Sequence, residues 1–525
     1  MTTIRLTRNK VHNWYKENGV YAKGYFFTPD GKLYRDAGLC TYFSKLVDED
    51  DFRQKLLTAN GIFSVIIQQD TKLWMAVDRL RYFPLFYRQK GVDLWISDEV
   101  NSLFDAGEQK ETDPDACSEF SGLSYVLGNK TLLKTVFQLQ AGEMIRYEET
   151  QHRIVPAFYH RYFSEIKEIS FDEAKMQLKK IFQNIGQRMV QLIGDRPVVV
   201  SLSGGLDSRL IAFLLKKAGI KKVLCYTFGI KKGNPEWERS KIVAEKLGFQ
   251  WLFIDYGTMN EPDFRKQKRF INMVDYVAQY VSKFGFMQYF ATNYLIDEVK
   301  IPSDSIWFVG NGGDFFSGSH LRPYMQKYKS ISVIAQDLQY IHGNLVQLNR
   351  KEREKIRQTI QKELQTTIPL FYNVENWDLK ERQAKYIFNS DKLWEYYGIE
   401  TQIPLCDTEL MDFFVSLPFE YRLNQKLYKT VLTELFQEYD INFTQDIQMK
   451  EPTLIQQCKI WIKRAFPFLR KKNNLFQDDY FDFKRFSQSI LKELQEKNQA
   501  KKIISSNGIF SEWYLMQVKK EVSNT

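Results

Sequence analysis

Cysteine is scarce in this sequence, and the few cysteines lie far apart. There are 5 of them among 525 residues, and no two form a Cys-x-x-Cys pair. An odd number at wide spacing argues against a disulfide framework, and no pair has the spacing of a zinc site. We therefore expect reduced cysteines, which are typical of a cytoplasmic protein.

Long apolar runs are missing as well. No uninterrupted run reaches the roughly 18 apolar residues that predict a membrane-spanning helix. Residues 1–5 do not lead into the apolar region of a signal peptide. Internal repeats and low-complexity tracts are also absent. The sequence therefore predicts no integral membrane segment.

Positive charge is in excess, with a formal net charge of +10 at pH 7, but Lys and Arg are spread along the whole chain. This distribution favours a solvated basic surface over a nucleic-acid site. The length favours two domains. Short runs such as Val20–Phe27 and Leu73–Val77 predict antiparallel strands in residues 1–160. Beyond residue 170, strands alternate with helical segments, which predicts a parallel sheet with helices on both faces.

The most informative stretch is Ser203–Ser208, which reads Ser-Gly-Gly-Leu-Asp-Ser. The β-branched residues 198–200 predict a buried strand before it, and a helix is expected after it. A glycine-rich turn between a strand and a helix aims backbone N–H groups at an anion. Asp207 would repel a phosphate unless a cation lay between them, so the pattern predicts nucleotide phosphates with Mg²⁺ and Asp207 as a metal ligand. The expected nucleotide-binding residues here are Leu202, Ser203, Gly204, Gly205, Asp207 and Ser208.

This stretch is not a Walker loop, because no Gly-Lys-Ser/Thr follows. It resembles the pyrophosphate loop of the N-type ATP pyrophosphatases and, in its wording, that of the asparagine synthetases. Phe228, at the end of the next predicted strand, stands where the related enzymes line the adenine site. An ordinary buried strand that ends in glycine is an equally good interpretation of Phe228.

A second glycine-rich segment, residues 310–318, follows another predicted strand. It resembles the Gly-x-Gly-x-Asp-Glu motif of the same family. The resemblance implies that Asp314 shares Mg²⁺ with Asp207. Asn311 stands where asparagine synthetases have Glu and β-lactam synthetases have Tyr, and Phe315 replaces the acidic residue, so the acceptor substrate stays open. The glycines expected to approach the ligand are Gly310 and Gly312.

Residues 398–407 resemble another segment of the synthetase domain, although Gln402 replaces its Arg. Glu400 matches a carboxylate that contacts the acceptor amine or the base, which makes it the candidate for handling the amine proton. Further on, Lys429 and Lys450 match lysines that the resemblance implies contact phosphate and pyrophosphate. Solvated lysines are the plainer interpretation in so basic a chain.

Residues 78–87 resemble a segment of the glutaminase domain of asparagine synthetases, with Arg81 where the family has Gly. In that family the nucleophile is a cysteine directly after the initiator Met. Here Thr2 stands in that place, and the first cysteine is Cys40. A threonine alcohol is an alternative nucleophile, but a thiolate forms far more readily at neutral pH. We therefore expect an inactive glutaminase that is retained as a scaffold or for partner contacts.

The resemblance implies a fold of the α/β and α+β classes. Residues 1–162 are expected to form an Ntn-hydrolase-like, glutaminase-like αββα domain. Residues 170–525 are expected to form a parallel-sheet adenine-nucleotide α-hydrolase-like domain, the PP-loop type, with a helical C-terminal part. A capping box at residues 170–173 predicts the start of its first helix.

The function implied by the resemblance is that of an ATP-dependent amide-forming ligase. Such an enzyme activates a small-molecule or peptide carboxylate as acyl-AMP, releases pyrophosphate and couples the acyl group to ammonia or another amine. Two alternatives stay open: a catalytically inactive or regulatory homologue, and an intramolecular cyclase of the β-lactam synthetase or lasso-peptide cyclase kind. We expect ATP and Mg²⁺ as cofactors, no nucleic-acid partner and a cytoplasmic location, while a homodimer stays open.

Overall fold

The structure is a computed structural model that describes residues 2–69, 71–231, 234–259, 263–443, 479–497 and 501–524. Its N-terminal part contains a seven-stranded sheet in the order β11-β10-β6-β5-β3-β2, with β4 paired to β3, and every pair is antiparallel. The expected strands at residues 20–27 and 73–77 are confirmed as β3 and β6. The bounds are β2 Tyr15–Glu17, β3 Val20–Phe27, β4 Leu33–Arg35, β5 Asn60–Gln69, β6 Lys72–Val77, β10 Glu143–Glu148 and β11 Arg153–Phe158.

A second, four-stranded sheet has the order β1-β8-β7-β9, in which only the β1–β8 pair is parallel. One buried cluster joins residues of the two sheets, such as Met75 and Ile96, and another lies between the larger sheet and two helices, where Phe26 meets Phe43. The layers are thus those of a glutaminase-like domain. The bounds are β1 Thr2–Arg5, β7 Phe86–Lys90, β8 Asp93–Ser97, β9 Phe137–Gln138, α1 Ala37–Phe43, α2 Glu49–Thr58 and α3 Pro114–Leu123.

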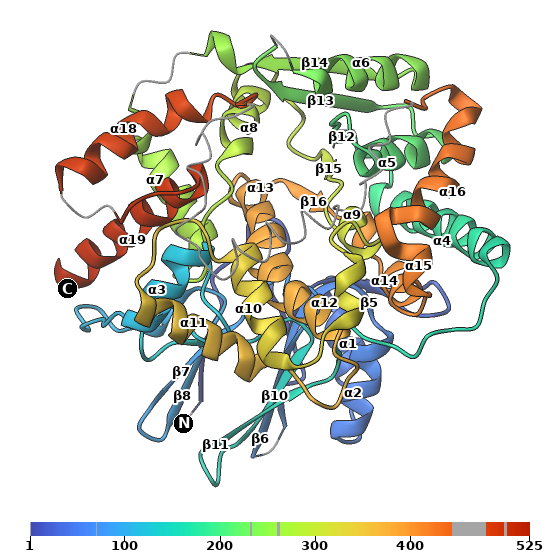
Figure 1. The fold of residues 1–525 in the computed structure, drawn as a ribbon. Coiled ribbons are helices and arrows are strands. Elements are labelled where there is room, and N and C mark those ends of the chain that lie inside the picture. The colour runs from blue at the N-terminus through green and yellow to red at the C-terminus, as the bar shows by residue number, and fades with distance from the viewer. Residues whose placement is uncertain are drawn as a thin grey trace.

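The C-terminal part is built on a five-stranded sheet in the order β14-β13-β12-β15-β16, and all its pairs are parallel (Figure 1). This confirms the parallel-sheet, PP-loop type of domain. Its first helix, α4, begins with the predicted capping box, because the Ser170 hydroxyl accepts the Glu173 N–H. The bounds are α4 Phe171–Ile193, β12 Val198–Ser201, α5 Leu206–Lys217, β13 Val223–Gly229, α6 Pro235–Leu247, β14 Gln250–Asp255, β15 Ile306–Phe308 and β16 Glu400–Gln402.

Most of the remaining described residues are helical. Residues Leu379–Ile387 form a π-helix, a rare conformation that is often found at functional sites. The bounds of the α-helices are α7 Lys268–Ala278, α8 Met287–Asp297, α9 Gly313–Phe316, α10 Ile331–His342, α11 Arg350–Glu363, α12 Tyr372–Asp378, α13 Lys392–Tyr396, α14 Thr408–Val415, α15 Phe419–Arg422, α16 Lys426–Phe436, α18 Phe483–Glu496 and α19 Ser506–Asn524.

The two parts share a continuous apolar core. One cluster of buried residues contains Phe86 and Phe120 of the N-terminal part together with Val199 and Leu210 of the parallel-sheet part. In Figure 1, α3 lies beside α11 and α19, which belong to the C-terminal part. Among the described residues no helix is long and apolar enough to cross a membrane, and the four cysteines that the structure describes are free and buried.

Candidate active site

The predicted phosphate loop lies between the end of β12 and the start of α5, at the carboxyl edge of the parallel sheet. Two serine hydroxyls shape it. The Ser203 N–H donates to the Ser208 hydroxyl at 3.1 Å, and the Gly205 N–H donates to the Ser203 hydroxyl at 3.1 Å. Because these contacts order the turn internally, its backbone is set before any ligand binds.

The second glycine-rich segment begins where β15, the neighbour of β12, ends. A Cβ atom on Gly310 would lie 2.9 Å from the Ser208 nitrogen, and one on Gly313 would lie 2.7 Å from the Asp207 side chain. Gly312 has a φ of +96°, which disfavours other residues. Glycine is therefore required here because the two loops touch.

This approach brings Asp207 and Asp314 together. The Asp314 N–H donates to Asp207 Oδ2 at 2.7 Å, and the Tyr428 hydroxyl donates to Asp207 Oδ1 at 2.8 Å. Burial, and next the charge of Asp314, raise the pKa of Asp207 to about 7. Two neighbouring carboxylates at the edge of a cavity therefore carry unfavourable negative charge unless a cation is bound.

These residues fit Mg²⁺. The ion prefers oxygen ligands, and in nucleotide sites it commonly takes one or two carboxylates, with phosphate oxygens and water completing the shell. Among the residues that the structure describes, no group of three His, Cys, Asp or Glu could hold a metal by itself. Asp207 and Asp314 thus suit an ion that arrives with the nucleotide, rather than an ion held entirely by protein.

A cavity of about 650 Å³ opens beside these loops. Its position at the carboxyl ends of β12 and β15 is where open parallel sheets bind ligands. The structure brings seven of the residues expected from the sequence together in its lining: Ser203, Gly205, Asp207, Ser208, Gly310, Gly312 and Asp314.

Another wall of the cavity contains residues that the sequence analysis did not identify. Asp391 is 2% exposed, and both of its oxygens accept hydrogen bonds from the Asn311 side chain, at 2.8 and 3.1 Å. Burial raises the pKa of Asp391 to about 7. Lys283 and Arg382 supply positive charge to the same cavity. The other lining residues of this wall include Phe284, Phe286, Met287, Gln383, Tyr386, Ile387, Ser390 and Trp394.

Three of the expected nucleotide-binding residues do not line this cavity. Leu202 is 1% exposed, and its N–H donates to the Tyr226 carbonyl oxygen within the sheet. Gly204 lies against Arg239 on the other side of the loop. Phe228 packs against Tyr256 and Phe481 in an aromatic cluster, with ring centroids 5.3 and 5.6 Å away.

Two of the three expected catalytic residues also lie elsewhere. Glu400 is the first residue of β16, where it pairs with Ile306, the first residue of β15, so it lies at the amino edge of the sheet, opposite the cavity. There its carboxylate accepts from Arg196 at 2.5 Å and from Gln402 at 2.9 Å. Lys429, on α16, is not among the residues that line the cavity. The residue before it, Tyr428, is the one that reaches Asp207. Lys450 lies outside the described residues.

In the N-terminal part, Asp78 orders the segment at residues 78–87, which resembles the glutaminase-domain motif. Asp78 accepts hydrogen bonds from the N–H groups of Leu80 and Tyr82, at 2.7 and 3.0 Å. Arg81, in the place of the family glycine, adopts a φ of +56°. Thr2 is in β1, and its hydroxyl donates to Glu149 Oε1 at 2.7 Å.

Tyr428 supplies a testable link between α16 and the metal-binding pair. Replacing Tyr428 by Phe removes a hydrogen bond that holds Asp207, and losing such a supporting partner typically costs about 10-fold or more in metal affinity or activity. We expect the Mg²⁺ concentration that is needed for nucleotide binding to rise by about 10-fold or more. Calorimetric titration with ATP at several Mg²⁺ concentrations measures it. Tyr421→Phe is the matched control, because its hydroxyl donates to the Ile169 carbonyl oxygen, away from the pair. An unchanged Mg²⁺ dependence in Tyr428→Phe would contradict the assignment.

Family models match both parts of the chain. The family model for asparagine synthase matches residues 187–453, and that for a glutamine amidotransferase domain matches residues 50–162. The microcin J25-processing protein McjC of Escherichia coli is 21% identical over 425 residues, which cover 75% of this chain and 74% of that protein. Asparagine synthetase [glutamine-hydrolyzing] 3 of Bacillus subtilis is 22% identical over 407 residues, which cover 71% of this chain and 64% of that protein.

Among solved structures, the NH3-dependent NAD synthetase of Campylobacter jejuni is matched over 42% of this chain and 96% of that chain. The identity is 16% and the TM-score 0.21, which is too low for an inference. The asparagine synthase model spans half of the chain, including both glycine-rich loops and both carboxylates of the Asp207–Asp314 pair. The chain therefore belongs to the asparagine synthase family, as an ATP-dependent amide-forming enzyme of that type.

Proposed function

We propose that this protein activates a carboxylate of a large, partly apolar substrate as acyl-AMP and joins it to an amine of the same substrate. The observation that carries the proposal is the cavity itself. One wall holds the phosphate loop with Asp207 and Asp314, and the other holds a buried carboxylate, Asp391, among aromatic side chains. The first wall suits nucleotide phosphates, and the second suits a bulky acyl group with an amine to deprotonate.

The chemistry needs two displacements. A carboxylate oxygen of the substrate attacks the α-phosphorus of ATP, and the bond from that phosphorus to pyrophosphate breaks. The amine nitrogen then attacks the activated carbonyl carbon, the bond to AMP breaks, and the amine loses a proton. Mg²⁺, held by Asp207 and Asp314, would supply positive charge that offsets the charge of the departing pyrophosphate.

The residues of this chain have separate tasks in that sequence. N–H groups of the loop between β12 and α5 orient the phosphates. Lys283 and Arg382 can hold negative groups of the substrate. Asp391 takes the proton of the amine, because it lines the cavity and Asn311 holds its carboxylate in place.

An amine within the substrate is favoured over free ammonia by two observations. Five aromatic side chains of the cavity, among them Phe284, Tyr386 and Trp394, would have little to contact in a small amino acid. McjC, which is named for processing microcin J25, matches three quarters of this chain. Such a reaction is the intramolecular kind that lasso-peptide cyclases and β-lactam synthetases perform.

We further propose that the N-terminal part has no glutaminase activity, because Thr2 replaces the family cysteine and its hydroxyl is engaged with Glu149. Glutamate release from glutamine, measured with and without Mg·ATP, tests this. Release above that of a Thr2→Ala variant would overturn it.

The main experiment is a screen of peptides that carry both a side-chain carboxylate and a free α-amine, with Mg·ATP. We expect a product that has lost one water, with AMP and pyrophosphate formed in equal amounts. In Asp391→Asn, amide formation should fall by about 100-fold, the usual contribution of a general base, while AMP formation by slow hydrolysis of the adenylate continues. N-acetylated peptides are the substrate control. Asparagine formation from aspartate and ammonia, with no reaction of any peptide, would contradict the proposal.

A further inference from the structure

The acceptor wall, defined here as residues 379–396, has two faces. One face lines the cavity through Arg382, Tyr386 and Asp391. The other face carries charged side chains that are almost completely buried: Glu381, Lys385, Lys392 and Glu395. The proposed chemistry uses none of these four. All of them are held by contacts with the N-terminal part of the chain or with one another.

The first anchor lies behind the π-helix. The Gly128 N–H donates to both carboxylate oxygens of Glu381 at 3.2 Å. The Lys385 ammonium donates to the carbonyl oxygens of Val126 and Gly128, at 3.0 and 2.6 Å, and to Glu381 at 2.5 Å. Glu381 and Lys385 are both 0% exposed. The turn at residues 126–128 thus supplies further hydrogen bonds to the buried ion pair of Glu381 with Lys385.

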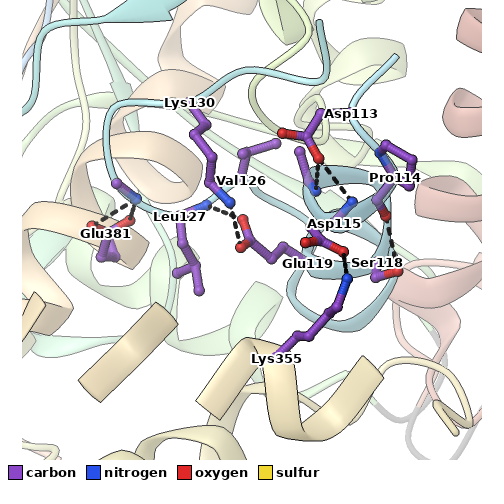
Figure 2. Close-up of polar contacts among 12 residues, drawn as sticks. Asp113, Pro114, Asp115, Ser118, Glu119, Val126, Leu127, Lys130, Lys355 and Glu381 are labelled. Carbon is purple, nitrogen blue, oxygen red and sulfur yellow. Dashed lines mark hydrogen bonds and ion pairs between the residues drawn. The ribbon is translucent and has the colours of Figure 1, made fainter. Parts of the chain in front are cut away.

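That turn is itself held in the N-terminal part. The Leu127 N–H donates to Glu119 Oε2 at 3.0 Å, and the Lys130 ammonium pairs with Glu119 Oε1 at 2.6 Å. Figure 2 shows Leu127 and Lys130 directed at Glu119, with Glu381 on the other side of the same turn. Glu119 belongs to α3, so a continuous set of hydrogen bonds runs from that helix to the π-helix.

The second anchor lies at the other end of the wall. Glu395 accepts from Lys23 of β3 at 3.0 Å and from Lys392 at 2.6 Å. The Lys392 ammonium also lies 4.0 and 4.2 Å from the ring centroids of Tyr82 and Phe83. Lys23, Tyr82 and Phe83 of the N-terminal part therefore hold α13, the helix directly after Asp391, in place.

We infer that the N-terminal part of the chain positions the acceptor wall. Within the wall, Glu381 is the central positioning residue, because it receives the hydrogen bonds from the N-terminal part. Buried ion pairs add little net stability, because desolvation cancels most of their attraction, but they penalise any arrangement that leaves a charge unpaired. A π-helix is rare. One anchor within it and a second one after it restrict the wall to the register that points Arg382, Tyr386 and Asp391 into the cavity. The inference rests on the proposed function only in taking this cavity as the substrate site.

The test is hydrogen–deuterium exchange of the full-length protein, followed by mass spectrometry. In Glu381→Gln we expect exchange in residues 379–396 to rise by about 10-fold, since local opening becomes easier when an anchor is lost. Exchange in β12 and β13 and the affinity for a non-hydrolysable Mg·ATP analogue should stay within about 2-fold of the wild type, because the phosphate loop is not held by this anchor. With a substrate in hand, its KM should rise while the KM for ATP stays unchanged.

Lys355→Met is the matched control. It removes an ion pair with Asp115 that also joins the two parts of the chain, but both side chains are about half exposed, 46% and 49%, and neither touches the wall (Figure 2). Lys23→Met loosens the second anchor and serves if Glu381→Gln does not fold. Wild-type exchange in residues 379–396 in the anchor variant, or an equal rise along the whole chain, would overturn the inference. Because exchange and analogue binding need no substrate, they decide it even if the proposed reaction fails.

Discussion

Asp207→Asn is expected to lower pyrophosphate release from ATP by about 1,000-fold or more. The change removes one charge of the Asp207–Asp314 pair, and stabilisation of developing charge by a bound metal is worth several kcal/mol to such a reaction. The amide oxygen can still accept the Asp314 N–H, and the amide nitrogen can donate to the Tyr428 hydroxyl, so the loops should keep their geometry. The measurement is a coupled pyrophosphate assay with the substrate identified by the peptide screen.

Asp304→Asn is the control for a lost aspartate charge, because Asp304 is exposed in the turn before β15. It should leave the rate unchanged. Asp314→Asn should resemble Asp207→Asn. If pyrophosphate release in Asp207→Asn stayed within about 10-fold of the wild type, the metal assignment would be wrong, because losing a supporting residue alone can cost that much.

Arg422→Met is expected to destabilise the fold by about 3–5 kcal/mol, the cost of removing one partner from a buried ion pair. The side chains of Arg422 and Glu375 are both 0% exposed. Two nitrogens of the guanidinium each donate to one carboxylate oxygen, and the bond from Nη1 to Oε2 is 3.0 Å long. The variant leaves the carboxylate buried with His320 beside it, at 3.3 Å, but without the guanidinium. The midpoint of urea unfolding, followed by circular dichroism, measures the loss.

The double variant Glu375→Met with Arg422→Met is the control. Replacing both charges with apolar side chains is often close to neutral, so it should recover most of the loss. A double variant as unstable as Arg422→Met would show that the guanidinium acts through packing instead.

The same pair predicts a pH dependence. Burial alone would raise the pKa of Glu375, but the charge of Arg422 and the nearby His320 bring this pKa down to about 2. A folded-state pKa below that of the unfolded chain, about 4.5 for Glu, stabilises the fold above the unfolded value. The difference between wild type and Arg422→Met should thus be larger at neutral pH than in acid. It shrinks first above pH 4.5, because without Arg422 the buried carboxyl of the variant is protonated more readily, and further as the pH falls from about 4.5 towards 2, where the wild type loses its ion pair.

Much of the phosphate side of the cavity could be predicted from the sequence. The β-branched run before Ser203 predicts a buried strand, and the glycines of both loops predict a close approach of the backbone to a ligand, because both patterns depend on residues that are close in the sequence. The pairing of Asp207 with Asp314 was implied by the resemblance to asparagine synthetases, and adjacent parallel strands, which bring their carboxyl ends to one edge, make it possible. The family motifs added the expectation of ATP and of an amide-forming reaction.

The acceptor side could not be predicted in the same way. Asp391 lies 80 residues beyond its partner Asn311 and carries no glycine or strand signal. Glu400 and Asp391 are both acids in the same stretch of sequence, and only the strand register shows that Glu400 begins β16 at the far edge of the sheet. Tyr428 and Lys429 are neighbours in sequence, but the orientation of α16 decides which of them reaches Asp207.

The sequence by itself determined the parallel-sheet class, the phosphate loop and the carboxylate pair, because each depends on residues close in the chain or on the ends of adjacent strands. Tertiary structure alone decided the acceptor wall. Its position depends on contacts between residues more than 250 apart, such as Gly128 with Glu381 and Lys23 with Glu395. No local pattern encodes such pairs, since a buried charge becomes tolerable only when a distant part of the chain supplies its partner.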